Sequence, residues 1–184
     1  MKNGTIFLWP YEKSDKPFWN FVGKAISFFS GYPYTHDAIL VDGNVYEYSV
    51  WTQDGKWKTG LRVTPIEEFE KVRYGYEIWK PTFTLTKKES SMMVYYAETF
   101  LAPHRYNVLK LLSLAVVYPL RGIFKKLKWV PFDSFLFGDV CSMVPDEMMM
   151  YAGIDLFPDD IGGYIVPGMY TECQYYIFDK KRTN

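Results

Sequence analysis

Three residues of this sequence have side chains that together suit nucleophilic chemistry: Cys141, His36 and Glu47. In such a set a thiolate attacks a carbonyl carbon, an imidazole takes and returns the proton, and a carboxylate orients the imidazole. Cys141 stands in "GDVCSMVPDEMMMYAG" (138–153), a pattern typical of a helix start, where the thiol pKa falls and backbone N–H groups hold an oxyanion. Free cysteine is also among the most buried residue types, so a packing role for Cys141 is the alternative.

His36 and Glu47 belong to one predicted β-hairpin, "YTHDAILVDGNVYEYSV" (34–50). The pair Asp42-Gly43 between two strand-like runs is a strong signal for a two-residue turn. With that turn, His36 and Glu47 share one face of the sheet because side chains alternate along a strand, and they lie diagonally across from each other. The hairpin therefore predicts an imidazole–carboxylate pair.

The length of the turn decides whether this pair forms. A three-residue turn through Asn44 would move Glu47 to the face of Asp37, since a slip of one residue reverses every side chain. The orienting group would then be Ser49, Asp37 or a distant residue. If both residues have only a structural role, His36 is a half-buried strand residue that hydrogen-bonds to a neighbour, and Glu47 is a solvated carboxylate on the strand.

The other cysteine and the other histidine are weaker candidates. Cys173 lies in "TECQYYIF" (171–178), which favours a strand, so we expect it to pack in the core. His104, in "LAPHRYN" (101–107), is at a loop or helix end and is a minor alternative base. Two histidines and two distant cysteines offer no metal-ligand spacing, and no Gly-rich phosphate loop occurs, so the sequence predicts neither a metal nor a cofactor.

The elements that position these residues are short strands and helices in separate blocks. We expect strands at 4–9, 74–81 and late in the chain at 164–167 and 173–179, an extended start to 61–70, a turn-rich loop at 51–60, helices at 18–31 and 86–101, and a helix from Cys141 to about Gly153. Thr86 followed by Glu89 predicts a capping box. Separate blocks of strands and helices indicate an α+β fold.

Composition limits the class of protein. The 184 residues fit one domain, 1–184, and the 48% of hydrophobic residues exclude disorder as the general state. Lys plus Arg and Asp plus Glu both number 21, so the overall charge does not favour a nucleic-acid partner. Two cysteines form no disulfide framework and suggest free thiols in a reducing compartment.

No targeting or spanning segment is expected. The apolar run at 6–9 is too short for a signal peptide, and the run at 111–120 holds ten residues where a spanning helix needs about 18 uncharged apolar ones. These features predict a cytoplasmic or peripherally membrane-associated protein.

A basic and apolar segment at about 105–129 has no acidic residue. Its cations are Arg105, Lys110, Arg121, Lys125, Lys126 and Lys128. Such a helical segment is typical of contact with an anionic membrane surface or a partner, here through Arg121, Lys125, Lys126 and Lys128. The alternative is a core helix with a solvated, lysine-bearing face.

Four segments in this order resemble the circularly permuted, NlpC-type papain-fold cysteine hydrolases, particularly the YiiX-like group, with lecithin–retinol acyltransferase more distant. They are "GTIFLW" (4–9), "YTHDAILVDGNVYEYS" (34–49), "AETFLAPHRYNVLKLL" (97–112) and "CSMVPDEMMMYAGI" (141–154) followed by "YIVPGMY" (164–170). The resemblance implies His36 as base, Glu47 as orienting acid and Cys141 as nucleophile. Thr5, where the family often has Asp, and Pro145 depart from its pattern.

The resemblance also implies a fold and an activity. The fold is a circularly permuted papain-like domain, with an antiparallel sheet packed against the cysteine-bearing helix. The activity is a thiol-dependent hydrolase that cleaves amide or peptide bonds, cell-wall peptides included, without a cofactor. The alternatives are an acyltransferase or thioesterase acting on lipid esters, and a catalytically idle binding module on the same fold.

Overall fold

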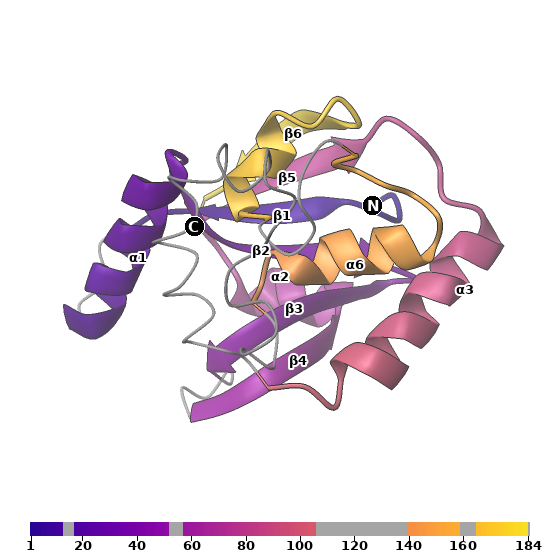
Figure 1. The fold of residues 1–184 in the computed structure, drawn as a ribbon, viewed down its shortest axis with the longest axis horizontal. Helices are drawn as coiled ribbons and strands as arrows, with labels where there is room; N and C mark the ends of the chain where they lie inside the picture. Colours follow the sequence, from indigo (N-terminus) through magenta and orange to yellow (C-terminus); the bar gives the residue numbers. More distant parts are fainter. Residues whose placement is uncertain (13–16, 52–56, 106–139, 159–164, 184) are drawn as a thin grey trace, which may run out of the picture.

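The computed structural model describes residues 1–12, 17–51, 57–105, 140–158 and 165–183, and a six-stranded antiparallel sheet runs through them in the order β4-β3-β2-β1-β5-β6 (Figure 1). The strands are β1 (Ile6–Pro10), β2 (Tyr34–Val41), β3 (Asn44–Trp51), β4 (Trp57–Pro65), β5 (Tyr76–Pro81) and β6 (Tyr176–Arg182). The α-helices of the described residues are α1 (Pro17–Ser30), α2 (Ile66–Val72), α3 (Lys87–Tyr96) and α6 (Met143–Tyr151). A π-helix, η1 (Ala97–Leu101), continues α3, and a 3-10 helix, η3 (Pro167–Thr171), precedes β6. The expected α+β class is confirmed.

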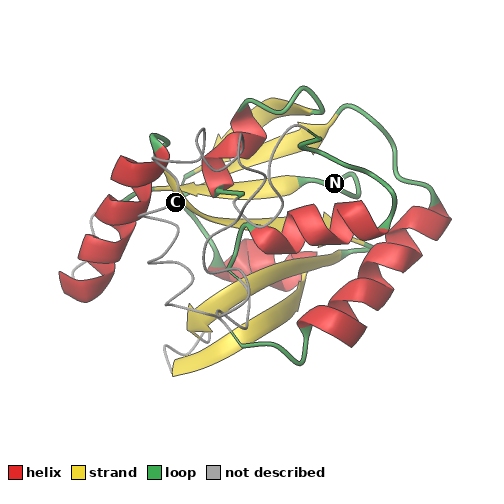
Figure 2. Ribbon diagram, in the orientation of Figure 1, coloured by secondary structure: helices red, strands yellow, loops and turns green. Residues whose placement is uncertain are grey.

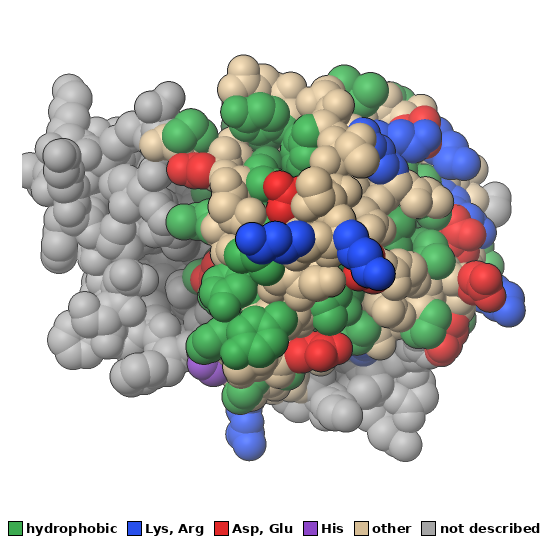
Figure 3. Space-filling view, turned by 90° about the vertical axis from the view of Figure 1, so that its right-hand side faces the viewer, with side chains coloured by type: hydrophobic (Ala, Val, Ile, Leu, Met, Phe, Trp, Pro, Cys, Tyr) green, Lys and Arg blue, Asp and Glu red, His purple; other side chains and the backbone are tan. Residues whose placement is uncertain are grey.

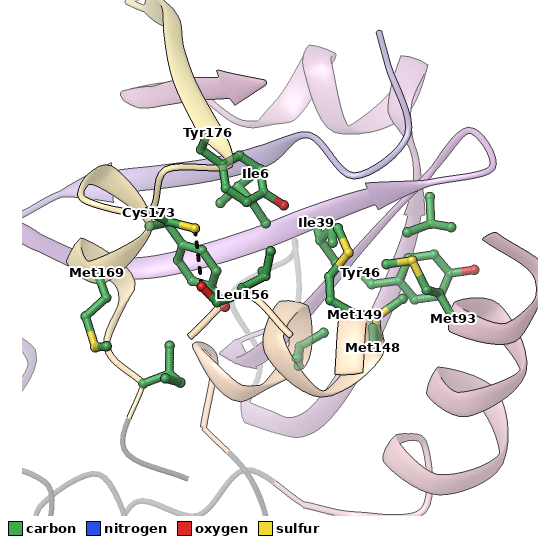
Figure 4. Close-up of a cluster of buried hydrophobic side chains, with 14 of the residues drawn as sticks. Ile6, Ile39, Tyr46, Met93, Met148, Met149, Leu156, Met169, Cys173 and Tyr176 are labelled. Carbon is green, nitrogen blue, oxygen red and sulfur yellow. Dashed lines mark hydrogen bonds between the residues drawn. The ribbon is translucent and has the colours of Figure 1, made fainter. Parts of the chain in front are cut away.

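Helices cover both faces of the sheet, with α6 and α3 on one side and α2 on the other (Figures 1 and 2). On the first side, here named the α6 face, Met148 and Met149 of α6 pack with Ile39 of β2 in one hydrophobic cluster (Figure 4). On the second side, the α2 face, Phe69 of α2 packs with Ala38 of β2 in a separate cluster. Consecutive β2 residues thus serve two different cores, as the alternation of strand side chains requires.

The hairpin between β2 and β3 has the predicted two-residue turn. Val41 pairs with Asn44, and the turn residues Asp42 and Gly43 have φ values of 46° and 77°. Positive φ at both central positions defines the type I′ turn, whose twist matches that of the flanking strands and which Asp-Gly favours. The register is therefore the one that puts His36 and Glu47 on one face, and the three-residue turn does not occur.

Helix α3 begins with the predicted capping box. The Thr86 hydroxyl accepts a hydrogen bond from the Glu89 N–H at 3.2 Å, and the Thr86 N–H donates to the Glu89 carboxylate at 2.6 Å. Two backbone N–H groups at the helix start, those of Thr86 and Glu89, thereby gain acceptors.

We expect Thr86→Ala to lower the free energy of unfolding by about 1 kcal/mol, because the N-cap acceptor is lost. Urea denaturation monitored by circular dichroism measures this change. Ser91→Ala is the matched control: Ser91 is exposed in the same helix and donates to the Lys87 carbonyl at 2.9 Å, so its replacement should change stability by less than about half as much. Equal losses in both variants would contradict a capping role for Thr86.

Three expectations about local structure need correction. The loop expected at 51–60 gives way to β4 at Trp57, because this segment pairs with β3. At 165–167 no strand forms, since Pro167 opens η3 instead. The last strand begins at Tyr176 rather than at 173, because the Tyr176 N–H bonds back to the Cys173 carbonyl in a turn.

The basic apolar segment at 105–129 lies outside the described residues apart from Arg105, so its role stays a prediction. Within the described part of the chain, no helix is both long and apolar enough to cross a membrane.

Candidate functional site

Cys141 lies just before α6, two residues ahead of the helix start. The helix begins at Met143 with Ser142 as N-cap, so Pro145 falls in the first turn, where its missing N–H costs nothing. The Cys141 side chain is 2% exposed. This placement keeps the thiol just before the first turn of α6.

The side chain that lies against Cys141 is Asp37 of β2. Asp37 is fully buried on the α6 face, and the thiol is close enough to donate a weak hydrogen bond to its carboxyl group. Neither carboxyl oxygen has a hydrogen-bond partner of regular geometry. Burial raises the Asp37 pKa well above 3.8, and the nearby Asp146 raises it further, while its own backbone and Cys141 lower it by less. Asp37 is therefore a carboxyl group that holds its proton far more strongly than usual.

Polar groups from α6 and η3 complete this buried cluster. Asp146 of α6 is buried, and the Tyr170 hydroxyl donates to the Ser142 carbonyl at 3.0 Å. Burial raises the Tyr170 pKa, and the charges of Asp37 and Asp146 add to the shift. The cluster thus combines a thiol, two carboxyl groups and a phenol in a region that disfavours negative charge.

His36 and Glu47 meet as predicted, but on the α2 face. The His36 Nε2 is 2.8 Å from Glu47 Oε2, and Glu47 Oε1 accepts from Arg73 at 2.8 Å and from Arg62 at 3.4 Å. Burial raises the Glu47 pKa, but the hydrogen bond and charge of His36 and the charge of Arg73 outweigh it, and the pKa falls to about 2. Glu47 is therefore ionised, so Nε2 carries the proton and donates it.

The structure does not bring Cys141 to His36. Asp37, which touches the thiol, is the neighbour of His36 along β2, so the two side chains leave the sheet on opposite faces. The His36 ring lies instead against Trp9, with 5.0 Å between ring centroids, and Trp9 packs on Phe69 of α2. The expected contact between thiol and imidazole is thus replaced by a contact between thiol and carboxyl group.

Sequence reasoning named Asp37 only as a substitute orienting group. The available signal was its position: Asp37 alternates with Ile39 and Val41, so a carboxylate stands in line with an apolar strand face. A charged residue at such a position is either paired or protonated, and both outcomes mark an unusual environment.

The other candidates occupy the predicted places. Cys173 is buried in the hydrophobic cluster on the α6 face, and its thiol donates to the Leu156 carbonyl at 3.6 Å (Figure 4). Burial raises the pKa of this thiol, which suits packing and not nucleophilic attack. His104 is exposed after η1. Among the residues with described positions, no group of three or more His, Cys, Asp or Glu side chains is arranged to hold a metal ion.

No family model and no curated protein matches this chain. Among solved structures, it is similar to a crystal structure described as the metalloprotein YiiX of Escherichia coli. The two are 14% identical, the alignment covers 100% of this chain and 98% of that chain, and the TM-score is 0.57. The YiiX-like α+β fold that the sequence resemblance implied is therefore confirmed.

Proposed function

From the YiiX-like fold and the position of Cys141, we propose that the chain is a thiol-dependent hydrolase with Cys141 as nucleophile and Asp37 as proton acceptor. The observation that carries the proposal is the contact between the Cys141 thiol, at the edge of α6, and a fully buried carboxyl group of raised pKa. A carboxylate of raised pKa is a stronger base than an exposed one, so its basicity approaches that of a thiolate.

In the proposed reaction, the ionised Asp37 takes the thiol proton as sulfur forms a bond to the substrate carbonyl carbon. The protonated Asp37 then gives this proton to the leaving nitrogen or oxygen, and water hydrolyses the thioester with Asp37 as base. The first-turn N–H groups of Met143 and Val144 already donate to Val140 and Cys141 carbonyls, so oxyanion donors must come from outside this turn. Because only ionised Asp37 accepts the proton, we expect activity to rise with pH.

The proposal includes a permuted papain-like order in a single domain, 1–184, with the histidine hairpin before the cysteine helix. Following the family resemblance, the substrates are amides or peptides, including cell-wall peptides, and lipid acyl esters are the second class. In this arrangement His36 and Glu47 have no direct part in the reaction, because they lie on the α2 face.

A binding module is the second candidate, and an aromatic cluster favours it. Tyr95, Tyr96, Phe100 and Tyr151 join at the contact of α3, η1 and α6, and the ring centroids of Tyr96 and Tyr151 are 4.9 Å apart. Three of these side chains are exposed, and Figure 3 shows hydrophobic side chains gathered on this side of the molecule among charged ones. Exposed apolar patches of this kind are typical of interaction surfaces.

A covalent intermediate separates the two candidates. When the chain is mixed with activated thioesters and peptide esters and quenched within seconds, mass spectrometry should find an acyl group on the peptide that contains Cys141. Cys141→Ala should abolish both the adduct and turnover, whereas the matched Cys173→Ala should retain both. Absence of any adduct on Cys141, or an adduct equally on Cys173, would contradict the hydrolase and leave the binding module.

A further inference from the structure

The charged residues around Glu47 form a second cluster, separated from Cys141 by the sheet. This α2-face cluster consists of Glu47, His36, Arg62, Arg73 and Trp9. Glu47 on β3 is directly opposite Arg62 on β4, and Trp9 on β1 is directly opposite His36 on β2. Arg73 closes the cluster from the C-cap of α2, where its N–H bonds to the Phe69 carbonyl. Four strands and one helix thus fix these side chains in place.

The carboxylate of the cluster is buried, whereas its nitrogen-bearing side chains are partly exposed. The Glu47 side chain is 1% exposed, whereas those of His36, Arg62 and Arg73 are 26%, 16% and 31% exposed. The carboxylate therefore lies beneath partly exposed arginine and histidine side chains. Two guanidinium groups and an imidazole converge on this single carboxylate.

The charge of the cluster is positive. Glu47 stays ionised above pH of about 2, and both arginines are always protonated, so these described residues carry a net charge of +1 with neutral His36 and +2 with protonated His36. Glu70 of α2, three residues before Arg73, pairs with Arg182 at 3.1 Å, so its negative charge does not offset this positive excess. Glu67 and Glu68 are exposed at the start of α2, one turn or more from Arg73.

We propose that the α2-face cluster binds an oxyanion, the phosphate or carboxylate group of a small ligand, through Arg73, with His36 adding a donor at Nδ1 when its imidazole is protonated, because Nε2 already donates to Glu47. Arg73 contacts Glu47 through Nη2 alone, and a guanidinium presents five N–H donors in a planar fork that suits two oxygens at once. Glu47 orients the cations before the ligand arrives, which removes part of the entropic cost of binding. The Trp9 ring beside His36 offers an apolar wall for the rest of the ligand.

The histidines make this site observable, because the chain has only His36 and His104. The probes are inorganic phosphate and acetate, added to the intact chain at constant pH and ionic strength while the two imidazole proton resonances are followed by NMR. We expect the His36 resonance to shift and saturate in the millimolar range, as a single exposed oxyanion site requires, whereas the exposed His104 resonance stays in place. A response to phosphate alone assigns a phosphorylated ligand, and a response to acetate alone assigns a carboxylate ligand.

Variants of Arg73 decide the assignment. Arg73→Gln should weaken the binding of the effective probe at least about tenfold, and Arg73→Lys, which keeps the charge beside Glu47, should give a smaller loss. Lys80→Gln is the control, since this ammonium pairs with Asp179 between β5 and β6 and its loss should leave the affinity unchanged. No saturable His36 shift with either probe, or equal affinity in Arg73→Gln and the unaltered chain, would overturn the proposal.

Discussion

Replacing Glu47 with alanine is expected to lower the free energy of unfolding by about 3 kcal/mol at pH 7. The carboxylate is buried, and its pKa falls from 4.5 to about 2, a difference that corresponds to about 3 kcal/mol of interaction favouring the charged form. Its removal also leaves His36 and Arg73 facing each other without the anion between them. Urea denaturation followed by tryptophan fluorescence measures the loss.

The same residue predicts a sensitivity to acid. Because the folded-state pKa of Glu47 lies below its unfolded value, the stabilisation is complete above about pH 5 and is lost as the pH falls toward 2. The difference in stability between the unaltered chain and Glu47→Gln should therefore shrink over this range. Glu70→Ala is the control: the pair of Glu70 with Arg182 is partly exposed and should contribute less than about 1 kcal/mol. Similar losses for Glu47 and Glu70 would show that the cluster contributes no more than a surface pair.

Replacing Asp37 with asparagine is expected to change how stability depends on pH above about pH 4, whereas the effect of Glu47 appears as the pH falls toward 2. The folded-state pKa of Asp37 is raised, chiefly by burial, so the unfolded chain releases this proton more readily than the folded chain. Its contribution to stability is present below about pH 4 and is lost as the pH rises toward the folded-state pKa. The loss amounts to about 1.4 kcal/mol for each pH unit in this interval.

Asparagine cannot ionise, so this decrease of the free energy of unfolding with pH should disappear in Asp37→Asn. The stability of the variant relative to the unaltered chain should therefore rise between pH 4 and pH 7. The comparison uses the slope and not the absolute value, because the amide introduces a constant cost of its own at a buried site. Denaturation midpoints at four pH values are sufficient to measure it. Parallel pH curves for the two proteins would mean that Asp37 is ionised in the folded state, contrary to its burial.

The hairpin shows what could be predicted from the sequence. Asp42-Gly43 determines a two-residue turn, and this turn sets the register that joins His36 to Glu47. The sequence likewise predicts the capping box at Thr86 and the helix start beside Cys141. Each of these features depends on residues within one helical turn. Local signals of this kind do not require knowledge of the tertiary structure.

The side of the sheet that receives the cysteine helix could not be predicted in this way. On β2, Ala38 and Leu40 are as deeply buried as Ile39 and Val41, so the strand is apolar on both faces and its pattern favours neither. The choice is made by contacts with α6, more than 100 positions away along the chain, which pack on Ile39. The resemblance to cysteine hydrolases pointed to His36 as the base, whereas the packing puts Asp37 beside the thiol.

The rate of Cys141 alkylation as a function of pH tests this assignment most directly. In a Cys173→Ser background, iodoacetamide labelling is measured for the parent, Asp37→Asn and His36→Gln. If Asp37 and Cys141 share a proton, the parent profile should show two ionisations that belong to the pair, and Asp37→Asn should show one. His36→Gln should keep both. Loss of one ionisation in His36→Gln, with the profile of Asp37→Asn unchanged, would contradict the account and identify His36 as the partner of the thiol.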